Sequence, residues 1–174
     1  MKLADDHFTL LGLPRRQALD RALLDERRRE LQAQVHPDRF AAEGAAAQRV
    51  AMQWAVRVNE AWQTLKDPLK RAAYLCELAG APIDAERNTA MPAAFLMQQM
   101  RWREALDEAA GADAIERIDE EVAREERVAL ARLTALLDEQ GDAEAAAAQV
   151  RALMFVARFR EDVAHRLEAL HDAP

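Results

Sequence analysis

The residue types best suited to chemistry are His36 and Asp38, which stand on either side of Pro37. An imidazole and a carboxylate close together can move a proton, so this pair could in principle act as a general acid and base. Residues 1–76 supply no other part of a catalytic site, because they contain no evident nucleophile, oxyanion pocket or phosphate-cradling glycine loop. The pair therefore points to recognition rather than catalysis, and we expect no enzymatic activity.

Pro37 predicts a rigid corner at this place. A proline cannot continue the helix before it, and it biases His36 away from helical backbone angles. The chain there should turn between two helices and expose His36 and Asp38 together. Because the backbone is already fixed, little ordering entropy remains to be lost on binding. Such a corner suits docking onto a partner.

The flanking segments have the apolar spacing of helices that would hold this corner. Asp20 is a good N-cap for the first long helix, with Leu19 and Leu24 placed as a hydrophobic staple. The second long helix ends at Asp67, just before a proline. A short helix around Phe8 precedes both and should lie across them. The expected stripes are Phe8, Leu10 and Leu11; Leu24, Leu31 and Val35; and Ala51, Ala55, Val58, Trp62 and Leu65.

The segment after the corner, up to Gly44, is expected to be a loop. Arg28 falls on an apolar stripe, where we expect its methylenes to cover the core edge and its guanidinium to reach water.

Composition supports an all-α fold in two domains. Apolar residues make up 51% of the 174 residues and charged residues 32%, with few aromatic side chains. The net charge of −7 is uneven, because residues 1–76 hold 13 Lys and Arg against 10 Asp and Glu, whereas the remainder holds 11 against 21. This asymmetry argues against a nucleic-acid binder and for two domains with different partners. We place the first domain at 1–76, the boundary segment at 77–91 and the second domain at 92–174.

The second domain is predicted to be an antiparallel bundle of three helices. Its first helix carries more apolar side chains than one face can bury. Phe95, Trp102, Leu106 and Ala109 share the core stripe, whereas Leu96, Met97 and Met100 point about 100–200° away, beside Arg103 and Glu104. The last helix should bury Leu153, Val156, Phe159, Val163, Leu167 and Leu170, with Phe155 at the edge of that stripe. We interpret the surplus side chains as an exposed patch for a protein partner, and a wider core or a dimer seam stay open as alternatives.

Other features of the sequence bear on disulfides, metal binding and cellular location. Cys76 is the only cysteine, so no internal disulfide or cysteine zinc site can form. The histidines do not form a metal-ligand set, and we expect neither a metal nor a cofactor. The chain begins without an apolar signal core and has no apolar run long enough to cross a bilayer. We expect a soluble, cytoplasmic protein that does not bind membranes.

Three motifs in order resemble the J-domain. They are Asp6-His7-Phe8-Thr9-Leu10-Leu11-Gly12-Leu13, then His36-Pro37-Asp38-Arg39-Phe40, then Asn59-Glu60-Ala61-Trp62-Gln63-Thr64-Leu65-Lys66-Asp67-Pro68 followed by Arg71-Ala72-Ala73-Tyr74. Further along, Ala94-Phe95-Leu96-Met97-Gln98-Gln99 and Arg103-Glu104-Ala105-Leu106-Asp107-Glu108 resemble the carboxy-terminal domain of the HscB family, the J-domain co-chaperones of iron-sulfur cluster assembly. The resemblance covers almost the whole chain. It is to the bacterial form, because the eukaryotic form has an amino-terminal zinc module that is not found here.

The resemblance implies a non-enzymatic co-chaperone. Its J-domain would dock on a DnaK-like chaperone of the HscA type and stimulate ATP hydrolysis by that partner, while its bundle would hold the iron-sulfur scaffold protein IscU. The residues implied for the chaperone contact are His36, Pro37, Asp38, Arg27, Arg29 and Arg39. Those implied for the scaffold contact are Leu96, Met97, Met100, Glu104 and Phe155.

The chain also departs from the family pattern. Glu30 and Gln34 stand where J-domains are often basic, and Arg28 stands where an aromatic residue is usual. Arg101 replaces an acidic residue that is common at the scaffold contact. A J-domain protein with a different client, or a helical protein that uses the patch for self-association, therefore remain alternatives.

Overall fold

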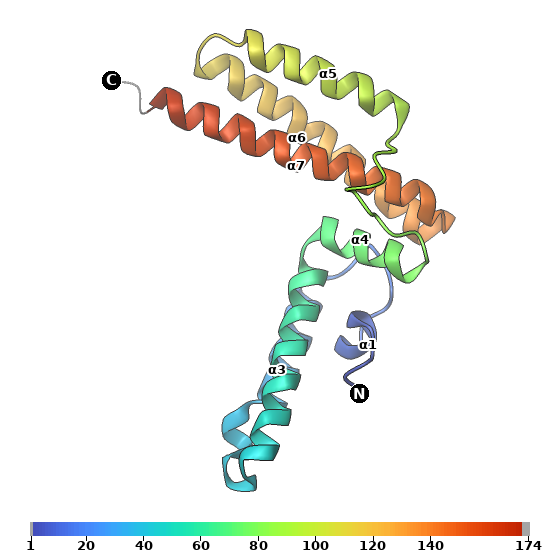
Figure 1. The fold of residues 1–174 in the computed structure, drawn as a ribbon, viewed down its shortest axis with the longest axis vertical. Helices are drawn as coiled ribbons and strands as arrows, with labels where there is room; N and C mark the ends of the chain where they lie inside the picture. Colours follow the sequence, from blue (N-terminus) through green and yellow to red (C-terminus); the bar gives the residue numbers. More distant parts are fainter. Residues whose placement is uncertain (1, 172–174) are drawn as a thin grey trace. The chain divides into compact units, whose positions relative to one another are not determined.

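The computed structural model describes residues 2–171, and every regular element in them is helical (Figure 1). The elements are α1 (His7–Leu11), α2 (Arg21–Gln34), the 3₁₀ helix η1 (Pro37–Glu43), α3 (Ala45–Lys66), α4 (Pro68–Leu78), α5 (Ala93–Glu108), α6 (Ala112–Ala135), the π-helical turn η2 (Leu136–Gln140) and α7 (Ala143–His171). The predicted all-α class is thus confirmed. The described chain divides into two compact units between Leu75 and Cys76. None of its helices is both long and apolar enough to span a bilayer.

Local capping sets where the first two helices begin. The Asp6 carboxylate accepts the backbone N–H groups of Phe8 and Thr9 at 3.0 and 3.1 Å, and Gly12 ends α1 in the left-handed conformation. Burial alone would raise the pKa of Asp6, but hydrogen bonds from Arg15 and Thr9 outweigh it and hold that pKa well below its usual range. Asp20 caps α2 in the same way as Asp6 caps α1.

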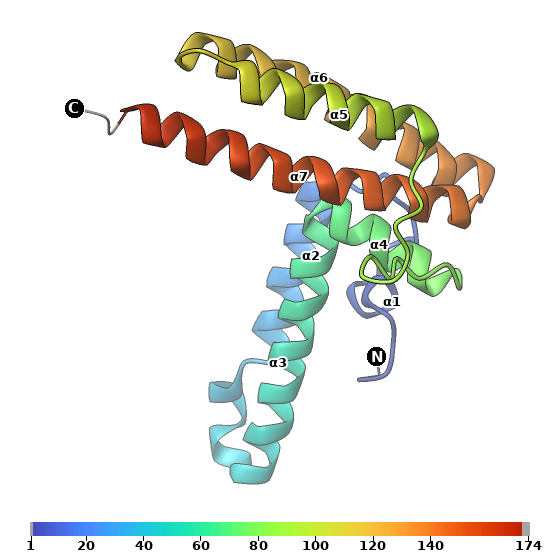
Figure 2. The same ribbon diagram turned by 45° about the horizontal axis from the view of Figure 1, so that its top comes forward.

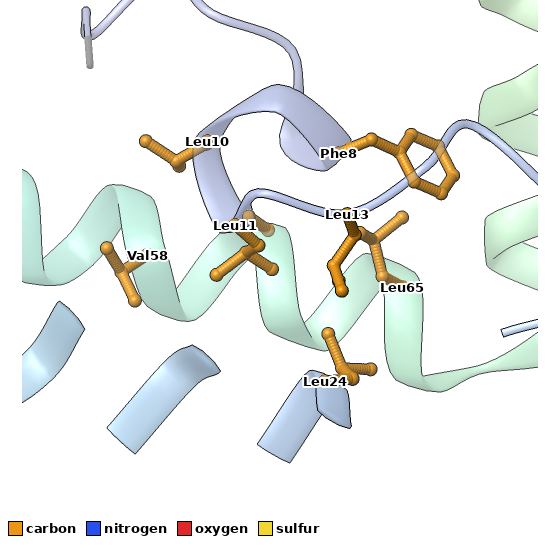
Figure 3. Close-up of a cluster of buried hydrophobic side chains, with 8 residues drawn as sticks. Phe8, Leu10, Leu11, Leu13, Leu24, Val58 and Leu65 are labelled. Atoms are coloured by element: carbon orange, nitrogen blue, oxygen red, sulfur yellow. The ribbon is translucent and has the colours of Figure 1, made fainter. Parts of the chain in front are cut away.

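The core of the first unit lies between α1 and the helix pair α2 and α3 (Figures 2 and 3). Leu24 from α2 and Leu65 from α3 are completely buried, and α1 contributes Phe8 and Leu11. Burying branched and aromatic side chains of this size stabilises a fold by about 1.5–3 kcal/mol each. The α2–α3 pair is therefore held as a stiff unit, with η1 connecting the two helices at one end.

A buried arginine anchors the loop between α1 and α2. Arg71 is 9% exposed and donates from Nε to the Gln17 carbonyl at 2.9 Å and from a terminal nitrogen to the Leu65 carbonyl at 2.5 Å. Gln17 donates in turn to the Pro68 carbonyl at 2.9 Å. This loop is thereby tied to the junction of α3 and α4.

The second unit is a three-helix bundle with an aromatic core. Phe95 and Trp102 of α5 meet Phe155 and Phe159 of α7, with ring centroids 5.8–6.4 Å apart. Ile115 and Val122 of α6 complete the cluster. Aromatic pairs at this separation add to the free energy gained from burial alone. The main core stripes of α5 and α7 lie where the sequence predicts them.

Three local features differ from the sequence predictions. The expected loop after Pro37 forms η1, because proline fits the first turn of a helix. The Arg28 guanidinium does not simply reach water: its carbon lies 3.9 Å from the centroid of the Trp62 ring. Leu170 is 42% exposed, because the apolar stripe of α7 runs past its neighbours near the helix end. The sequence made no prediction about contacts of the boundary segment, where the buried Arg151 donates to the Ile83 and Ala90 carbonyls at 3.0 and 2.6 Å.

Candidate functional site

The corner around Pro37 is exposed and locally ordered. The side chain of His36 is 59% exposed and that of Asp38 is 89% exposed. His36 is the N-cap of η1, and its Nδ1 accepts the backbone N–H of Asp38 at 3.3 Å. Pro37 occupies the first helical position, where its missing N–H costs nothing. The histidine, the proline and the aspartate thus form one short capped turn on the surface.

The hydrogen bond from Asp38 favours one tautomer of the neutral His36 ring. An Nδ1 atom that accepts a hydrogen bond carries no proton, so the neutral ring presents its N–H at Nε2. The Asp38 carboxylate lies 3.6 Å from the same Nδ1, and it can pair with that atom only when the ring is protonated. In the neutral state the Nε2–H group and the Asp38 carboxylate are therefore both available to a partner, one as a donor and the other as an acceptor.

The three predicted arginines lie on η1 and on α2, and they are held differently. Arg39 donates to the Ala33 carbonyl in the last turn of α2 at 2.9 Å, which ties η1 back to α2. Arg27 pairs with Glu30 at 3.0 Å, and both side chains are close to half exposed. Arg29 is exposed and has no ion pair within residues 2–171. Of the three predicted flanking contacts, Arg29 is the least engaged within its own chain.

The helix pair behind the corner is joined by a cluster that the sequence did not predict. The Trp62 indole donates to the Asp25 carboxylate at 2.6 Å, and the cations of Arg28 and Lys66 lie 3.9 and 4.2 Å from the Trp62 ring centroid. The hydrogen bonds from Trp62 and Arg21 hold the pKa of Asp25 below its usual range. Cations over an indole face attract its π-electrons. The cluster thus fixes α2 against α3 on the surface. Its only signal in the sequence was Arg28, which lies on an apolar stripe seven residues after Arg21.

The predicted patch on α5 is exposed. Met97 is 70% exposed, Met100 69% and Leu96 42%, and Glu104 is exposed beside them. Phe155 is partly buried, because its ring packs against Phe95 and Phe159 in the core. These five side chains, Leu96, Met97, Met100, Glu104 and Phe155, are called the α5 patch below.

Phe155 connects the α5 patch to the core. Its ring is covered on one side by Arg103, whose guanidinium carbon lies 5.0 Å from the ring centroid. A side chain that is both packed inside and partly exposed outside can anchor a partner while staying fixed itself. Arg103 was not among the residues expected at the contact. Its signal in the sequence was its place on the same side of α5 as Leu96.

Comparison with known proteins identifies the chain. A family model described as the HSCB C-terminal oligomerisation domain matches residues 91–164. A protein of Burkholderia mallei (strain SAVP1), named co-chaperone protein HscB homolog, is 54% identical over 173 residues, 98% of each chain. The chain belongs to the HscB co-chaperone family.

Solved structures of HscB proteins support this family assignment. Chaperone HscB from Vibrio cholerae has 38% sequence identity and a TM-score of 0.80, covering 95% of this chain and 99% of the other. Human co-chaperone protein HscB has 27% identity and a TM-score of 0.86, covering 95% of this chain and 84% of the other. The HscB resemblance read from the sequence motifs is therefore confirmed.

Proposed function

We propose that this HscB-family protein binds the iron-sulfur scaffold IscU through the α5 patch and delivers it to an Hsp70-type chaperone of the HscA kind. The His36–Asp38 corner then stimulates ATP hydrolysis by that chaperone. The cytoplasm is the proposed site of action. The protein performs no chemistry of its own in this scheme, because the hydrolysed nucleotide is bound by the partner.

The observation that carries the proposal is the exposed and preorganised corner. A ligand shifts an equilibrium of its partner only by binding one state better than the other. A turn fixed by the Pro37 ring and by the Asp38 N–H to His36 bond presents the same donor and acceptor at every encounter. Its binding free energy is then available to favour the hydrolysis-competent state of the chaperone, because little is lost in ordering the turn.

Electrostatics support an approach of the chaperone along α2. Arg39 places positive charge at the corner, Arg27 and Arg29 place it further back along α2, and Arg29 has no ion pair within the described residues. An acidic chaperone surface would be steered toward this end of the unit, and the gain in association rate would fall with added salt.

The α5 patch has the properties of a site for a protein client. Methionine side chains adapt to irregular surfaces, and exposed apolar side chains beside charged ones mark an interaction surface. A scaffold bound here and a chaperone bound at the corner would be joined through one chain. That connection raises the effective concentration of the scaffold at the chaperone.

The decisive experiment for the corner measures ATPase stimulation of a purified HscA-type chaperone, with and without IscU. His36→Gln should abolish the stimulation and leave the circular dichroism spectrum unchanged. The matched control is His165→Gln, which replaces an exposed histidine of α7 and should stimulate like the wild type. Full stimulation by His36→Gln would reject the role of the corner.

The α5 patch is tested by titrating IscU into the protein. Leu96→Ala combined with Met100→Ala should weaken binding at least tenfold, since hot-spot side chains carry about 2 kcal/mol or more each. The control pair Met52→Ala and Val56→Ala removes apolar side chains that are 58% and 53% exposed on α3, and it should bind IscU normally. Equal affinity of both double variants would favour another client, and loss of a dimer in sedimentation by the patch variant alone would favour self-association.

A further inference from the structure

A second surface of the bundle lies on the opposite side of α5 from Phe155. There α5, α6 and α7 enclose a hollow of about 270 Å³ whose floor includes Phe95, Trp102 and Val156. A neighbouring hollow of about 290 Å³ shares Pro92, Arg132 and Gln149 with it. The shared residues make the two hollows one elongated groove, and we call this the α5–α6 groove.

Gln149 is the unusual residue of the groove. It is 7% exposed, lines both hollows, and its carboxamide makes no hydrogen bond within the described part of the chain. The polar atoms of this carboxamide are not sealed from solvent, so water or a ligand in the hollow can reach them. A carboxamide carries two N–H donors and one carbonyl acceptor. The groove therefore holds an unused donor and an unused acceptor over an apolar floor.

The rim of the groove has an excess of positive charge. Arg101 and Arg132 line it and have no carboxylate partner among residues 2–171, although Arg101 donates to the side chain of Gln98. Glu125 is the one acidic residue that lines the first hollow. Guanidinium groups that lack an intramolecular acid are well suited to bind a carboxylate from a ligand.

We infer that the α5–α6 groove binds an extended peptide segment of a partner protein, with apolar side chains on the floor and an acidic side chain at Arg101 or Arg132. The free carboxamide of Gln149 matches a peptide group, which also offers one donor and one acceptor. An elongated groove suits an extended chain better than a compact ligand. Recognition of an extended peptide combines main-chain hydrogen bonds with pockets for alternate side chains.

This groove is separate from the α5 patch. Its α5 residues include Gln98, which lies about 200° around the helix from Leu96. A partner could occupy the groove while a client covers Leu96 and Met100. The inference thus goes beyond the proposed scaffold contact, and either can fail without the other.

The test uses the full chain labelled with ¹⁵N and a synthetic acetylated peptide of alternating leucine and aspartate. Binding should shift the side-chain amide signals of Gln149 and the indole signal of Trp102. A peptide of alternating leucine and lysine should bind much more weakly, because the rim is basic. Gln149→Leu should weaken binding of the acidic peptide about fivefold, from the loss of a peptide hydrogen bond.

Two further variants keep the result interpretable. Arg132→Glu reverses a charge on the rim and should abolish selection for the acidic peptide, whereas Gln53→Leu, an exposed glutamine of α3, should leave binding unchanged. Absence of shifts at Gln149 and Trp102, or equal binding of the two peptides, would overturn the inference. Binding of decanoate as tight as that of the peptide would also overturn it, because the groove would then be a site for a small amphiphile. The same shifts on concentrating the protein alone would overturn it too, because a second copy of the chain would then occupy the groove.

Discussion

Each unit of the molecule uses one buried arginine to hold a non-helical segment. In the first unit Arg71 donates to the carbonyls of Gln17 and Leu65. In the second, Arg151, which is 4% exposed, donates to the carbonyls of Ile83 and Ala90. The chemistry is the same, because in each case one guanidinium donates to two backbone carbonyls.

The two arginines differ in what else holds the segment. The segment bound by Arg71 also buries Leu13, and Gln17 makes a hydrogen bond of its own to Pro68. It is part of the core that positions α2. Residues 84–90 are exposed throughout, so Arg151 is their main attachment. The comparison indicates that Arg71 stabilises a whole unit, whereas Arg151 stabilises a local segment.

The largest effect is expected from Arg71→Met. The substitution keeps an unbranched apolar stem but leaves the Gln17 and Leu65 carbonyls without their donor. Each buried acceptor left unsatisfied costs about 1–3 kcal/mol, so we expect a loss of about 2 kcal/mol or more in the free energy of unfolding of the first unit. Amide hydrogen exchange of α2 and α3, measured by NMR, gives this quantity directly.

The control for this change is Arg49→Met, which replaces an exposed arginine of α3 and should change the free energy of unfolding by less than about 0.5 kcal/mol. Unchanged exchange in α2 after Arg71→Met would show that the loop is held by Leu13 and Gln17 alone. In that case Arg71, like Arg151, would stabilise only a local segment.

A smaller and more local effect is expected from Arg151→Met. The Ile83 and Ala90 carbonyls would lose their donor, but the Ala90 carbonyl can turn toward water because its segment is exposed. Faster exchange should appear in residues 84–92 and spread little into α6. Global destabilisation of the bundle as large as that caused by Arg71→Met would contradict the proposed difference.

The sequence predicted the parts of this architecture that depend on local rules. Asp20 was recognised as a cap because an N-cap bonds to its own next residues. The core stripes followed from the period of the helix. The same rotation of about 100° per residue placed Met97 and Met100 outside the core stripe. Family motifs then supplied the roles proposed for the corner.

The sequence did not predict the long-range polar contacts. Arg71 bonds to one carbonyl and Arg151 to two that lie more than 50 residues away along the chain. A charged residue on a helix is normally interpreted as a surface residue. The position of Arg28 over Trp62 also depends on how two helices pack. The α5–α6 groove was missed because an alanine-rich helix carries no pattern that marks Gln149 as facing a hollow.

A third prediction uses a titratable contact found in the first unit. Arg57 binds the amino-terminal segment through the Leu3 and Asp5 carbonyls and lies 3.1 Å from Nδ1 of His7, whose ring stacks on Tyr74. Burial and the nearby Arg57 charge lower the pKa of His7, although the charges of Glu60 and Asp6 oppose this. The neutral ring is therefore the form that the native unit favours.

The sign of the pH dependence follows from this lowered pKa. The unfolded chain binds a proton at His7 at a higher pH than the native unit does, so this stabilisation is complete above the ordinary histidine pKa of about 6.5 and is lost as the pH falls below it. We expect the first unit to lose more stability between pH 7 and pH 5 than a His7→Gln variant does, measured by urea unfolding. Parallel pH profiles of the two proteins would exclude His7 as the source.

The smallest expected effect concerns Cys76, at the junction where the two units divide. It is fully buried, and burial raises the pKa of its thiol to about 11. At pH 7.5 the native protein should therefore react with Ellman's reagent only as it opens, because the thiolate is the reactive form. Arg71→Met should speed the reaction by destabilising the unit that precedes Cys76, whereas Arg151→Met should change it little, since residues 84–92 can open without exposing α4. Equal acceleration by both variants would mean that the segment bound by Arg151 also protects the thiol, and the distinction between a unit-wide and a local arginine would fail.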